Sequence, residues 1–363
     1  MTLYIGIMSG TSLDGLDICL VQLESGISLS GSLYLEYPAE LKQDLLRLCQ
    51  PGDNEILHLS LAEQQWARLA ASGIQQLLAQ HSLTSDHIKA IGSHGQTIRH
   101  HPELGFSMQI GAPALLAELT GISVITHFRQ RDIAAGGQGA PLVPAFHHWL
   151  FQHRPGAQAI VTIGGFSNIS FITPDQPASG FDCGPGNVLL DAWINQHQQL
   201  PYDNNGNWAA SGQVQQQLLD KMLMDDFFQE KGPKSTGREL FNLNWLQRQL
   251  QCFDSISAVD VQCTLAEFTA CAISNSIRQH HSQIQELWLC GGGAHNAYLR
   301  QRLAAQLPGI KVGITDEIGV GADWMEAMAF AWLAHMFMEG KSASLPLVTG
   351  AKGARVLGAL YPA

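Results

Sequence analysis

The chain has 363 residues, 45% of them hydrophobic, which is enough for two ordinary domains with their own cores and too apolar for a disordered chain. Its formal charge of −11 and the absence of any block of Lys or Arg exclude a nucleic-acid partner, which would need a basic surface. Small molecules held by local charge are the expected ligands.

Cysteine usage and hydropathy indicate a cytoplasmic chain without a membrane segment. Seven cysteines are scattered with no CxxC pair, as expected for reduced thiols. The N-terminus enters a strand pattern directly, with no signal sequence. The most apolar late stretch, 325–337, contains two ionisable residues and is shorter than the ~20 residues of a membrane helix, so a buried helix is expected.

The chain opens with a strand, a turn rich in Gly, Ser and Thr, and a second strand, over 4–23. Such a turn offers bare N–H groups and hydroxyls to an anion. Its candidate nucleotide-binding residues are Ser9, Gly10, Thr11, Ser12, Asp14 and Gly15. Asp14 could also hold Mg²⁺ through a water, because hard cations prefer carboxylate oxygens. An ordinary Asp-Gly hairpin turn is the alternative.

The rest of the first half alternates helices and strands. Apolar periodicity predicts helices over 40–49, 55–80 and 113–119, and strands over 88–91, 106–110 and 122–126. This half is therefore α/β. The segment 134–144 is rich in Gly, Pro and Ala and has no regular period, so we place the domain junction there.

Two polar segments of the first half could bind a substrate. Residues 92–99 crowd hydrogen-bonding side chains into a predicted loop, with His94, Gln96 and Thr97 as candidates for a sugar pocket. Arg131, or else Arg129, could bind a carboxylate or phosphate. A polar surface loop and solvated arginines are the respective alternatives.

The second half repeats the opening pattern over 159–173, with Gly164, Gly165 and Asn168 as candidate nucleotide-binding residues. Neither turn leads into a helix, which excludes the dinucleotide fingerprint and the Walker loop. Helical patterns follow over 187–197, 212–230, 243–251, 260–281, 296–306 and 323–338. A strand over 286–290 enters Gly291, Gly292 and Gly293, where an adenine or ribose could lie against bare backbone. A tight turn without a ligand is the alternative.

Two carboxylates are candidates for catalysis. Asp182 is expected at the carboxyl end of a strand, where α/β sheets place ligand chemistry, and could act as a general base. Glu326 is a lone carboxylate in an apolar helix, so it should face a polar cleft, or else solvent near the helix start. A capping role is the alternative for Asp182.

The cationic segment 232–238 could be functional or a surface turn, and the His doublets lack zinc-ligand spacing, so we assign no zinc.

Together these motifs resemble the actin, Hsp70 and sugar-kinase superfamily, and within it the anhydro-N-acetylmuramic acid kinase family. The resemblance spans nearly the whole chain and rests on MSGTSLDG (8–15), GSHGQT (92–97), GGQGAPL (136–142), GGFSN (164–168), FDCGPGN (181–187) and KSTGRE (234–239). It implies a two-domain actin-like, ribonuclease H-like ATPase fold with a mixed sheet in each domain and an interdomain cleft. The domains would be 1–140 and 141–339, with 340–363 a candidate to pack back on the first.

The same resemblance implies an activity. ATP with Mg²⁺ would drive opening of the 1,6-anhydro ring of 1,6-anhydro-N-acetylmuramic acid by water and phosphorylation of its O6, in peptidoglycan recycling. By this resemblance Asp182 activates the water and Glu326 assists. Arg131, or else Arg129, is our candidate for the lactyl carboxylate, and the family suggests a homodimer. Rival functions on the same fold are a kinase for a different sugar or carboxylate and a polyphosphate phosphatase, and a rival of another class is a nucleotide-driven chaperone or filament protein.

Overall fold

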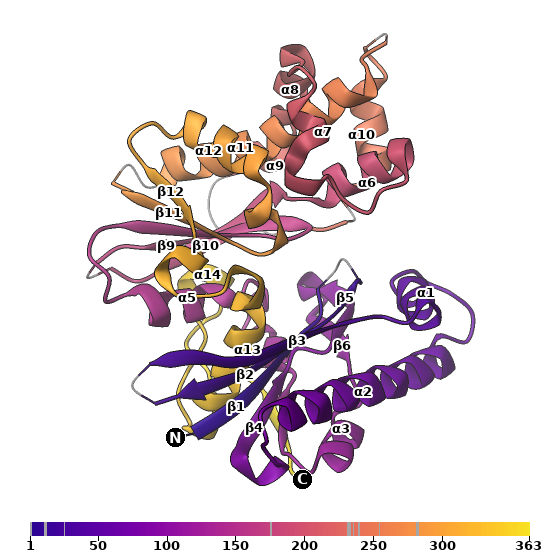
Figure 1. Cartoon of the computed structure of the whole chain (residues 1–363), viewed down its shortest axis with the longest axis vertical. Coiled ribbons are helices and arrows are strands. Elements are labelled where there is room, and N and C mark those ends of the chain that lie inside the picture. The colour runs from indigo at the N-terminus through magenta and orange to yellow at the C-terminus, as the bar shows by residue number, and fades with distance from the viewer. Residues whose placement is uncertain are drawn as a thin grey trace. The chain divides into compact units, whose positions relative to one another are not determined.

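The computed structural model describes residues 2–10, 13–24, 26–174, 176–230, 234, 236–238, 240–253, 255–280 and 283–363. The chain divides into two compact units, 1–150 together with 324–363, and 151–323 (Figure 1). The predicted boundaries, 1–140 and 141–339, differ from these units because the segment that returns to the first unit begins at 324 and includes the last long helix.

The first unit is built on a six-stranded mixed sheet with the order β13-β7-β4-β1-β2-β3. Strands β1, β2 and β3 pair antiparallel in succession, β4 and β7 continue the sheet parallel to β1, and β13 closes it antiparallel to β7. The strands are β1 (Thr2–Met8), β2 (Gly15–Leu23), β3 (Ile27–Glu36), β4 (Ile88–Ser93), β7 (Val124–Thr126) and β13 (Ala359–Tyr361). A separate antiparallel pair is formed by β5 (Gln96–His101) and β6 (Phe106–Ile110).

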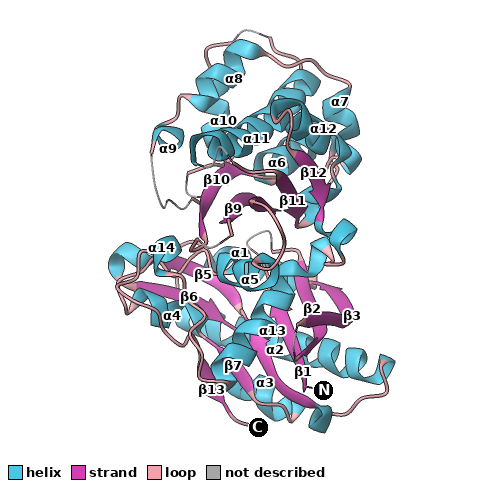
Figure 2. Ribbon diagram, turned by 90° about the vertical axis from the view of Figure 1, so that its left-hand side faces the viewer, coloured by secondary structure: helices cyan, strands magenta, loops and turns pink. Residues whose placement is uncertain are grey.

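Helices cover both faces of the first sheet. The helices of this part of the chain are α1 (Ala39–Leu48), α2 (Glu55–Gln80), α3 (Pro113–Thr120), α4 (Phe128–Ile133), α5 (Val143–Phe151), α13 (Met325–Met338) and α14 (Pro346–Thr349). Apolar side chains of α1, α2 and α3 form one core with alternate residues of β1 and β2, such as Ile5 and Ile7. Helix α13 contacts β1, β2 and β4, and Figure 2 shows it running along these strands.

Two glycines allow α13 to approach the sheet closely. A Cβ at Gly6 would overlap the carbonyl oxygen of Ala327, and one at Gly92 would overlap that of Phe330. Both residues lie on the face opposite the α1, α2 and α3 core, because side chains alternate along a strand. The backbone contact places the first turn of α13 at a fixed position against β1 and β4.

The second unit has a five-stranded mixed sheet with the order β10-β9-β8-β11-β12. Its strands are β8 (Gln158–Ile163), β9 (Phe166–Ile172), β10 (Ser179–Pro185), β11 (Glu286–Cys290) and β12 (Lys311–Ile314). Its helices are α6 (Val188–Gln198), α7 (Asn207–Ala210), α8 (Gln216–Leu223), α9 (Asp226–Gln229), α10 (Leu243–Leu250), α11 (Ala258–His280) and α12 (Ala297–Gln306). Apolar residues of α6, α8, α10 and α11 form a separate core cluster.

Both sheets follow one plan. In each, three strands that are consecutive in the chain pair antiparallel from one edge, and two later strands extend the sheet parallel to the first. The chain therefore carries the repeat that the two Gly-rich turns predicted. The predicted α/β class with a mixed sheet in each half is confirmed.

Several local expectations are corrected. The loop predicted over 92–99 is largely strand, since β4 runs to Ser93 and β5 starts at Gln96. The helix predicted over 212–230 is two short helices, α8 and α9. Strand β3 is not predicted because none of its ten residues is fully buried, four are exposed, and it contains Ser and Gly, so its apolar period is weak.

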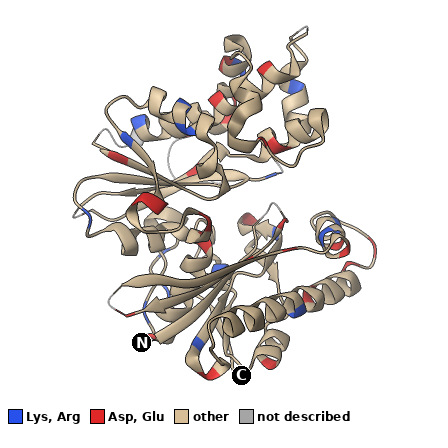
Figure 3. Ribbon diagram, in the orientation of Figure 1, with Lys and Arg blue, Asp and Glu red and all other residues tan. Residues whose placement is uncertain are grey.

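Charge and hydropathy follow the composition. Figure 3 shows Lys and Arg dispersed over both units and interleaved with acidic residues. None of the helices in the described part of the chain combines the length and apolar character needed to cross a membrane.

Candidate active site

The first Gly-rich turn joins β1 to β2. Thr11 and Ser12 lie outside the described residues, so its described part is 9–10 and 13–15. The Ser9 hydroxyl is buried and donates to the carbonyl of Gly95 at 2.7 Å. The carbonyl of Ser9 lies 3.2 Å from Nδ1 of His94, and the carbonyl of Gly10 accepts from Nε2 of Gln96 at 3.1 Å. The turn is therefore fixed from its carbonyl side by side chains of the β4–β5 segment.

Asp14 is exposed and pairs with Lys42 of α1, with Oδ1 3.0 Å from Nζ. Such an exposed ion pair contributes little stability. Within the described residues, no group of three or more His, Cys, Asp or Glu could hold a metal. A single exposed carboxylate fits Mg²⁺ that is held mainly by phosphate oxygens and water, which is how this ion commonly binds with nucleotides.

His94 and Gln96, predicted to bind the sugar, are buried and already hydrogen-bonded. Besides binding Gly10, Gln96 accepts from the Tyr37 hydroxyl at 3.0 Å through Oε1. Nε2 of His94 is 2.9 Å from Nη2 of Arg129, and burial together with this guanidinium lowers the pKa of His94 to about 3. The side chains of His94 and Gln96 thus bind the backbone carbonyls of the first turn, those of Ser9 and Gly10.

The other two substrate candidates are more accessible. Thr97 is partly buried on β5, and its hydroxyl accepts from Nε2 of Gln109 at 3.1 Å. Arg131 is exposed on α4 and makes no hydrogen bond or ion pair with any described residue. Arg129, the alternative to Arg131, donates to the carbonyl of Gly139 at 2.8 Å in addition to binding His94. Arg131 is therefore the better placed of the two for a ligand.

Glu326 lies in the first turn of α13 and is partly buried. Burial raises the pKa of its carboxyl above the ordinary value, and the charge of Arg129 opposes that rise. The sequence predicted either a polar cleft or exposure to solvent near the helix start. The carboxylate of Glu326 is neither fully buried nor exposed, and the charge of Arg129 acts on it.

The second Gly-rich turn, Gly164-Gly165, joins β8 to β9. The carbonyl of Gly164 accepts from the backbone N–H of Asn187, and the carbonyl of Gly165 accepts from Gly186 and Val188, all at 2.9 to 3.0 Å. A Cβ at Gly164 or Gly165 would find its nearest neighbours only at 3.7 and 3.9 Å. No described residue is close enough to require glycine at these two positions, so the backbone here is open to the close approach of a ligand.

Asp182 lies within β10, and the strand continues to Pro185 after a register shift, so the predicted position at the end of a strand is corrected. Its Oδ2 accepts from the backbone N–H of Thr236 at 3.0 Å, and its own N–H donates to the carbonyl of Lys234. Asn168 pairs with Asp182 across β9 and β10. Asn168, a predicted nucleotide-binding residue, therefore lies on strand β9 and not in the second Gly-rich turn. Among the described residues, Asn168 Oδ1 and the Thr236 hydroxyl are buried without a hydrogen-bond partner.

Lys234 anchors the segment that holds Asp182. Its ammonium donates to the carbonyl of Phe227 at 2.8 Å and lies 4.3 Å from the centroid of the Phe227 ring. Burial lowers the pKa of this ammonium. Sequence alone suggested a cation for a ligand, but the side chain faces α9 of its own unit. Residues 231–233, 235 and 239 of this segment lie outside the described residues.

The Gly triplet follows β11. Gly291 has φ +78°, and a Cβ at Gly293 would overlap Ile163, so the fold itself explains these two glycines. A Cβ at Gly292 would meet nothing within 4 Å. Only Gly292 therefore shows the open backbone that was predicted for the whole triplet.

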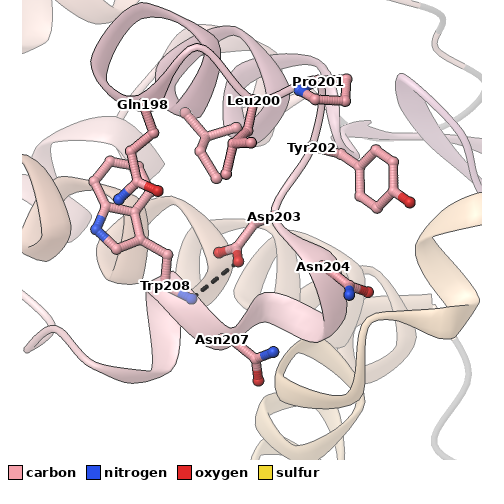
Figure 4. A pocket seen from close by; sticks show the side chains of 9 residues that line it. Gln198, Leu200, Pro201, Tyr202, Asp203, Asn204, Asn207 and Trp208 are labelled. Atoms are coloured by element: carbon pink, nitrogen blue, oxygen red, sulfur yellow. Dashed lines mark hydrogen bonds between the residues drawn. The ribbon is translucent and has the colours of Figure 1, made fainter.

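A pocket of about 480 Å³ opens on the same unit between the end of α6 and α7. It is lined by apolar, aromatic and amide side chains and one carboxylate: Ile194, Gln198, Leu200, Pro201, Tyr202, Asp203, Asn204, Asn207 and Trp208. Figure 4 shows the Asp203 carboxylate turned toward the backbone N–H of Trp208, with which it bonds at 2.9 Å. Gly206, between the lining residues Asn204 and Asn207 in the sequence, packs against Asn296, which is the N-cap of α12 and lies three residues after Gly293.

Comparison with known proteins decides the family. The chain matches the anhydro-N-acetylmuramic acid kinase family over residues 2–363. The chain belongs to this family. It is 58% identical over 362 residues to the anhydro-N-acetylmuramic acid kinase of Pseudomonas fluorescens (strain Pf0-1), covering 100% of both chains, and 49% identical to that of Nitrosomonas europaea, covering 99% of both. The protein is thus a carbohydrate kinase, and the predicted family is confirmed.

Similar solved structures are more distant. The (R)-2-hydroxyglutaryl-CoA dehydratase component A of Acidaminococcus fermentans covers 91% of this chain with 96% of its own, at 11% identity and a TM-score of 0.48. A ROK family glucokinase from Streptomyces griseus, in complex with glucose and AMPPNP, covers 92% with 99% of its own, at 11% identity and a TM-score of 0.41. Similarities at this level carry no argument about the site.

Proposed function

We propose that this member of the family uses ATP to convert 1,6-anhydro-N-acetylmuramic acid to N-acetylmuramic acid 6-phosphate in peptidoglycan recycling. The observation that supports it most is Asp182, a partly buried carboxylate fixed at one oxygen by Thr236 in a chain that matches the family from end to end. A carboxylate held in this way is suited to receive a proton from a bound water.

The proposed reaction couples two bond changes. Asp182 takes a proton from a water molecule while the oxygen of that water bonds to C1 of the sugar, and the bond between C1 and O6 breaks. The freed O6 attacks the γ-phosphorus of ATP, and ADP leaves with the electron pair of the broken P–O bond. The proton on Asp182 is then released to solvent, so that anhydro sugar, water and ATP give sugar 6-phosphate, ADP and a proton. Glu326 is the proposed second acidic group at the sugar.

The two Gly-rich turns are the proposed phosphate-binding elements. In each turn described carbonyls are bound from inside the protein, so that the N–H of the following residue, Gly10 in the first turn and Gly165 in the second, is directed to the other side for phosphate oxygens. The open backbone at Gly164 and Gly165 supports this role. Asp14 would hold Mg²⁺ together with the phosphates, and the ion would supply positive charge to the γ-phosphate.

Recognition of the sugar is assigned to Thr97 and Arg131. The lactyl group carries a carboxylate, and a guanidinium binds a carboxylate through two parallel hydrogen bonds. The exposure of Arg131 and its lack of any bonded partner among the described residues support its choice over Arg129. Arg131→Ala should raise the KM for the anhydro sugar and leave that for ATP unchanged, whereas Arg131→Lys should recover part of the loss.

The adenosine is assigned to Gly292 and to the pocket that contains Tyr202 and Asn207, both in the second unit. Aromatic rings and amides together can stack on a base and hydrogen-bond to its edge. Tyr202→Ala should raise the KM for ATP but leave that for the sugar unchanged. An equal effect on both constants would speak against this assignment. A matched control is Phe106→Ala, which removes an exposed ring from the start of β6, where it pairs with His101.

We also propose a cytoplasmic homodimer, since the family resemblance suggests one and the free cysteines suit a reducing compartment. Sedimentation equilibrium at micromolar concentration should give twice the 39.5 kDa mass of the chain. A monomer over the whole concentration range would overturn the dimer.

The decisive variant for the function is Asp182→Asn, which removes the base but keeps the shape of the side chain. We expect kcat to fall by about 100-fold or more, measured as phosphorylated sugar by ³¹P NMR. Asp226→Asn, an exposed change at the start of α9, is the matched control and should keep full activity. Full turnover by the Asp182 variant would refute the proposed role.

A further inference from the structure

We propose that His94 is a positioning residue for the first Gly-rich turn. Its neutral imidazole holds the Ser9 carbonyl in the way that backbone N–H groups at the start of α6 hold the second turn. This inference rests on the proposed function, because it takes the two turns as phosphate-binding elements.

The second unit shows what such a turn requires. Both carbonyls of Gly164-Gly165 point to the chain just before α6, where they accept from Gly186, Asn187 and Val188. A trans peptide group is planar, with its C=O and N–H on opposite sides. A carbonyl held inward therefore directs the N–H of the next residue outward, toward the place where an anion would bind.

The first unit has the same strand plan, and the chain after β3 leads into α1 as the chain after β10 leads into α6. Just before α1 the backbone N–H of Tyr37 donates to the carbonyl of Asp14 at 3.0 Å, whereas the carbonyls of Ser9 and Gly10 are bound by side chains. His94 binds the carbonyl of Ser9, and Gln96 donates to that of Gly10. The planar peptide between Ser9 and Gly10 then directs the N–H of Gly10 away from His94.

The protonation state of His94 follows from its neighbours. Arg129 can only donate, and it bonds to Nε2, so Nε2 must be the acceptor. The carbonyl of Ser9 can only accept, so Nδ1 must carry the hydrogen. The imidazole is therefore neutral, with one assigned tautomer, and it packs 4.8 Å from the ring centroid of Phe330.

This arrangement contrasts with the predicted role in sugar binding. Only 5% of the His94 residue is exposed, and both ring nitrogens are hydrogen-bonded. Arg129, which binds its far side, is in turn fixed to the carbonyl of Gly139. His94 thus connects α4 to the first turn and presents no polar atom to a ligand.

Three variants and one control test the proposal. His94→Leu removes both hydrogen bonds, whereas His94→Asn keeps an amide N–H near the position of Nδ1 and should still reach the Ser9 carbonyl. Gln96→Leu removes the bond to Gly10 and serves if His94→Leu fails to fold. The matched control is His100→Leu on β5, since Nδ1 of His100 binds Ser107 and neither residue belongs to the first turn.

The measurement is calorimetric binding of a non-hydrolysable ATP analogue with Mg²⁺ in the absence of sugar, together with the KM for each substrate. His94→Leu should weaken analogue binding about tenfold or more, because a buried carbonyl loses its donor. His94→Asn should stay within about threefold of the wild type. For His94→Leu, His94→Asn and the control His100→Leu, the KM for the sugar should be unchanged.

Three results would overturn the proposal. The first is a rise in the sugar KM without weaker analogue binding, which would make His94 a sugar-binding residue. The second is equal loss in His94→Leu and His94→Asn, and the third is normal analogue binding by His94→Leu and Gln96→Leu. Failure of the proposed function can be told apart from failure of the role of His94. If the wild type binds the analogue but does not phosphorylate the anhydro sugar, only the proposed function is refuted.

Discussion

The backbone N–H of Thr236 donates to Oδ2 of Asp182 at 3.0 Å, so one oxygen of the proposed base is fixed and the carboxylate has a set direction. Thr236→Pro removes this N–H, whereas Thr236→Ala keeps it and removes only the hydroxyl. We predict that the proline variant loses at least about tenfold in kcat with little change in the KM for ATP. The alanine variant should keep most of its activity.

The matched variants separate the N–H from the hydroxyl. Steady-state kinetics with both substrates provides the measurement, and far-UV circular dichroism checks that each variant is folded. Equal activity of the proline and alanine variants would show that the hydrogen bond to Asp182 does not matter for turnover.

Gly165 and Gly186 predict opposite consequences for the same substitution. A Cβ at Gly165 would have no neighbour nearer than 3.9 Å, so Gly165→Ala should fold normally and bind ATP more weakly by about tenfold or more, because the methyl group blocks the approach of phosphate. A Cβ at Gly186 would overlap the carbonyl of Gly164, so Gly186→Ala should lower the free energy of unfolding by about 1–3 kcal/mol.

Urea unfolding and nucleotide titration of both proteins test this pair. If Gly165→Ala proved as unstable as Gly186→Ala, the open space at the second turn would not be available to a ligand. Unchanged ATP binding by Gly165→Ala would remove the turn from the phosphate site.

Buried neutral histidines predict loss of stability in mild acid. Burial lowers the pKa of His94 and of His147 to about 3, below the ordinary value near 6.5 that they regain on unfolding. Between these values the unfolded chain binds more protons than the folded one, so stability falls as the pH decreases from 6.5 toward 3. Each histidine should cost about 1.4 kcal/mol at pH 5.5 relative to pH 8.

The check is the free energy of unfolding in urea at pH 5.5 and 8, for the wild type and for His147→Leu. In His147→Leu the difference in the free energy of unfolding between pH 8 and pH 5.5 should be smaller than in the wild type by about 1.4 kcal/mol, the contribution of one histidine. An identical pH dependence in the two proteins would show that His147 is protonated equally in the folded and unfolded states.

Glu267 and Arg302 connect α11 to α12, the helix that follows the Gly triplet. The carboxylate is buried, with 4% of its side chain exposed, and it accepts from Nε of Arg302 and from Nε2 of Gln306. Arg302→Met should lower the free energy of unfolding by about 2–3 kcal/mol, because it leaves a buried charge with one donor fewer. The exposed part of Arg302 keeps this value below that of a fully buried pair.

The double variant Glu267→Gln with Arg302→Met removes the charge together with its partner. It should recover most of the stability lost in the single variant, as measured by urea unfolding. A double variant as unstable as Arg302→Met would mean that packing of the arginine stem, and not the charge, provides the stabilisation.

Much of the fold could be predicted from the sequence because its elements carry strong local signals. Helix α2 and strands β6 and β11 occur at the predicted residues, since their apolar periods are clear and polar or glycine residues bound them. The two Gly-rich hairpins were also found at their predicted places. Strand β13 has three residues, too few for a period, and only its pairing with β7 defines it.

The roles of polar residues in the site were harder to predict, because residue type does not reveal direction. His94 and Gln96 lie in a polar segment that would suit a sugar, yet the fold turns them toward the backbone of the first turn. Lys234 likewise faces Phe227 instead of a ligand. Thr236 had no signal as a partner of Asp182, since it acts through its backbone N–H.

The central claim is that water opens the anhydro ring while ATP phosphorylates the freed oxygen, and product analysis after turnover in ¹⁸O water tests it most directly. The product should carry one ¹⁸O at the anomeric hydroxyl and an unlabelled phosphate on O6, after correction for exchange measured on unlabelled product kept in the same water. Label in the phosphate, or a product without label at the anomeric position, would contradict the account.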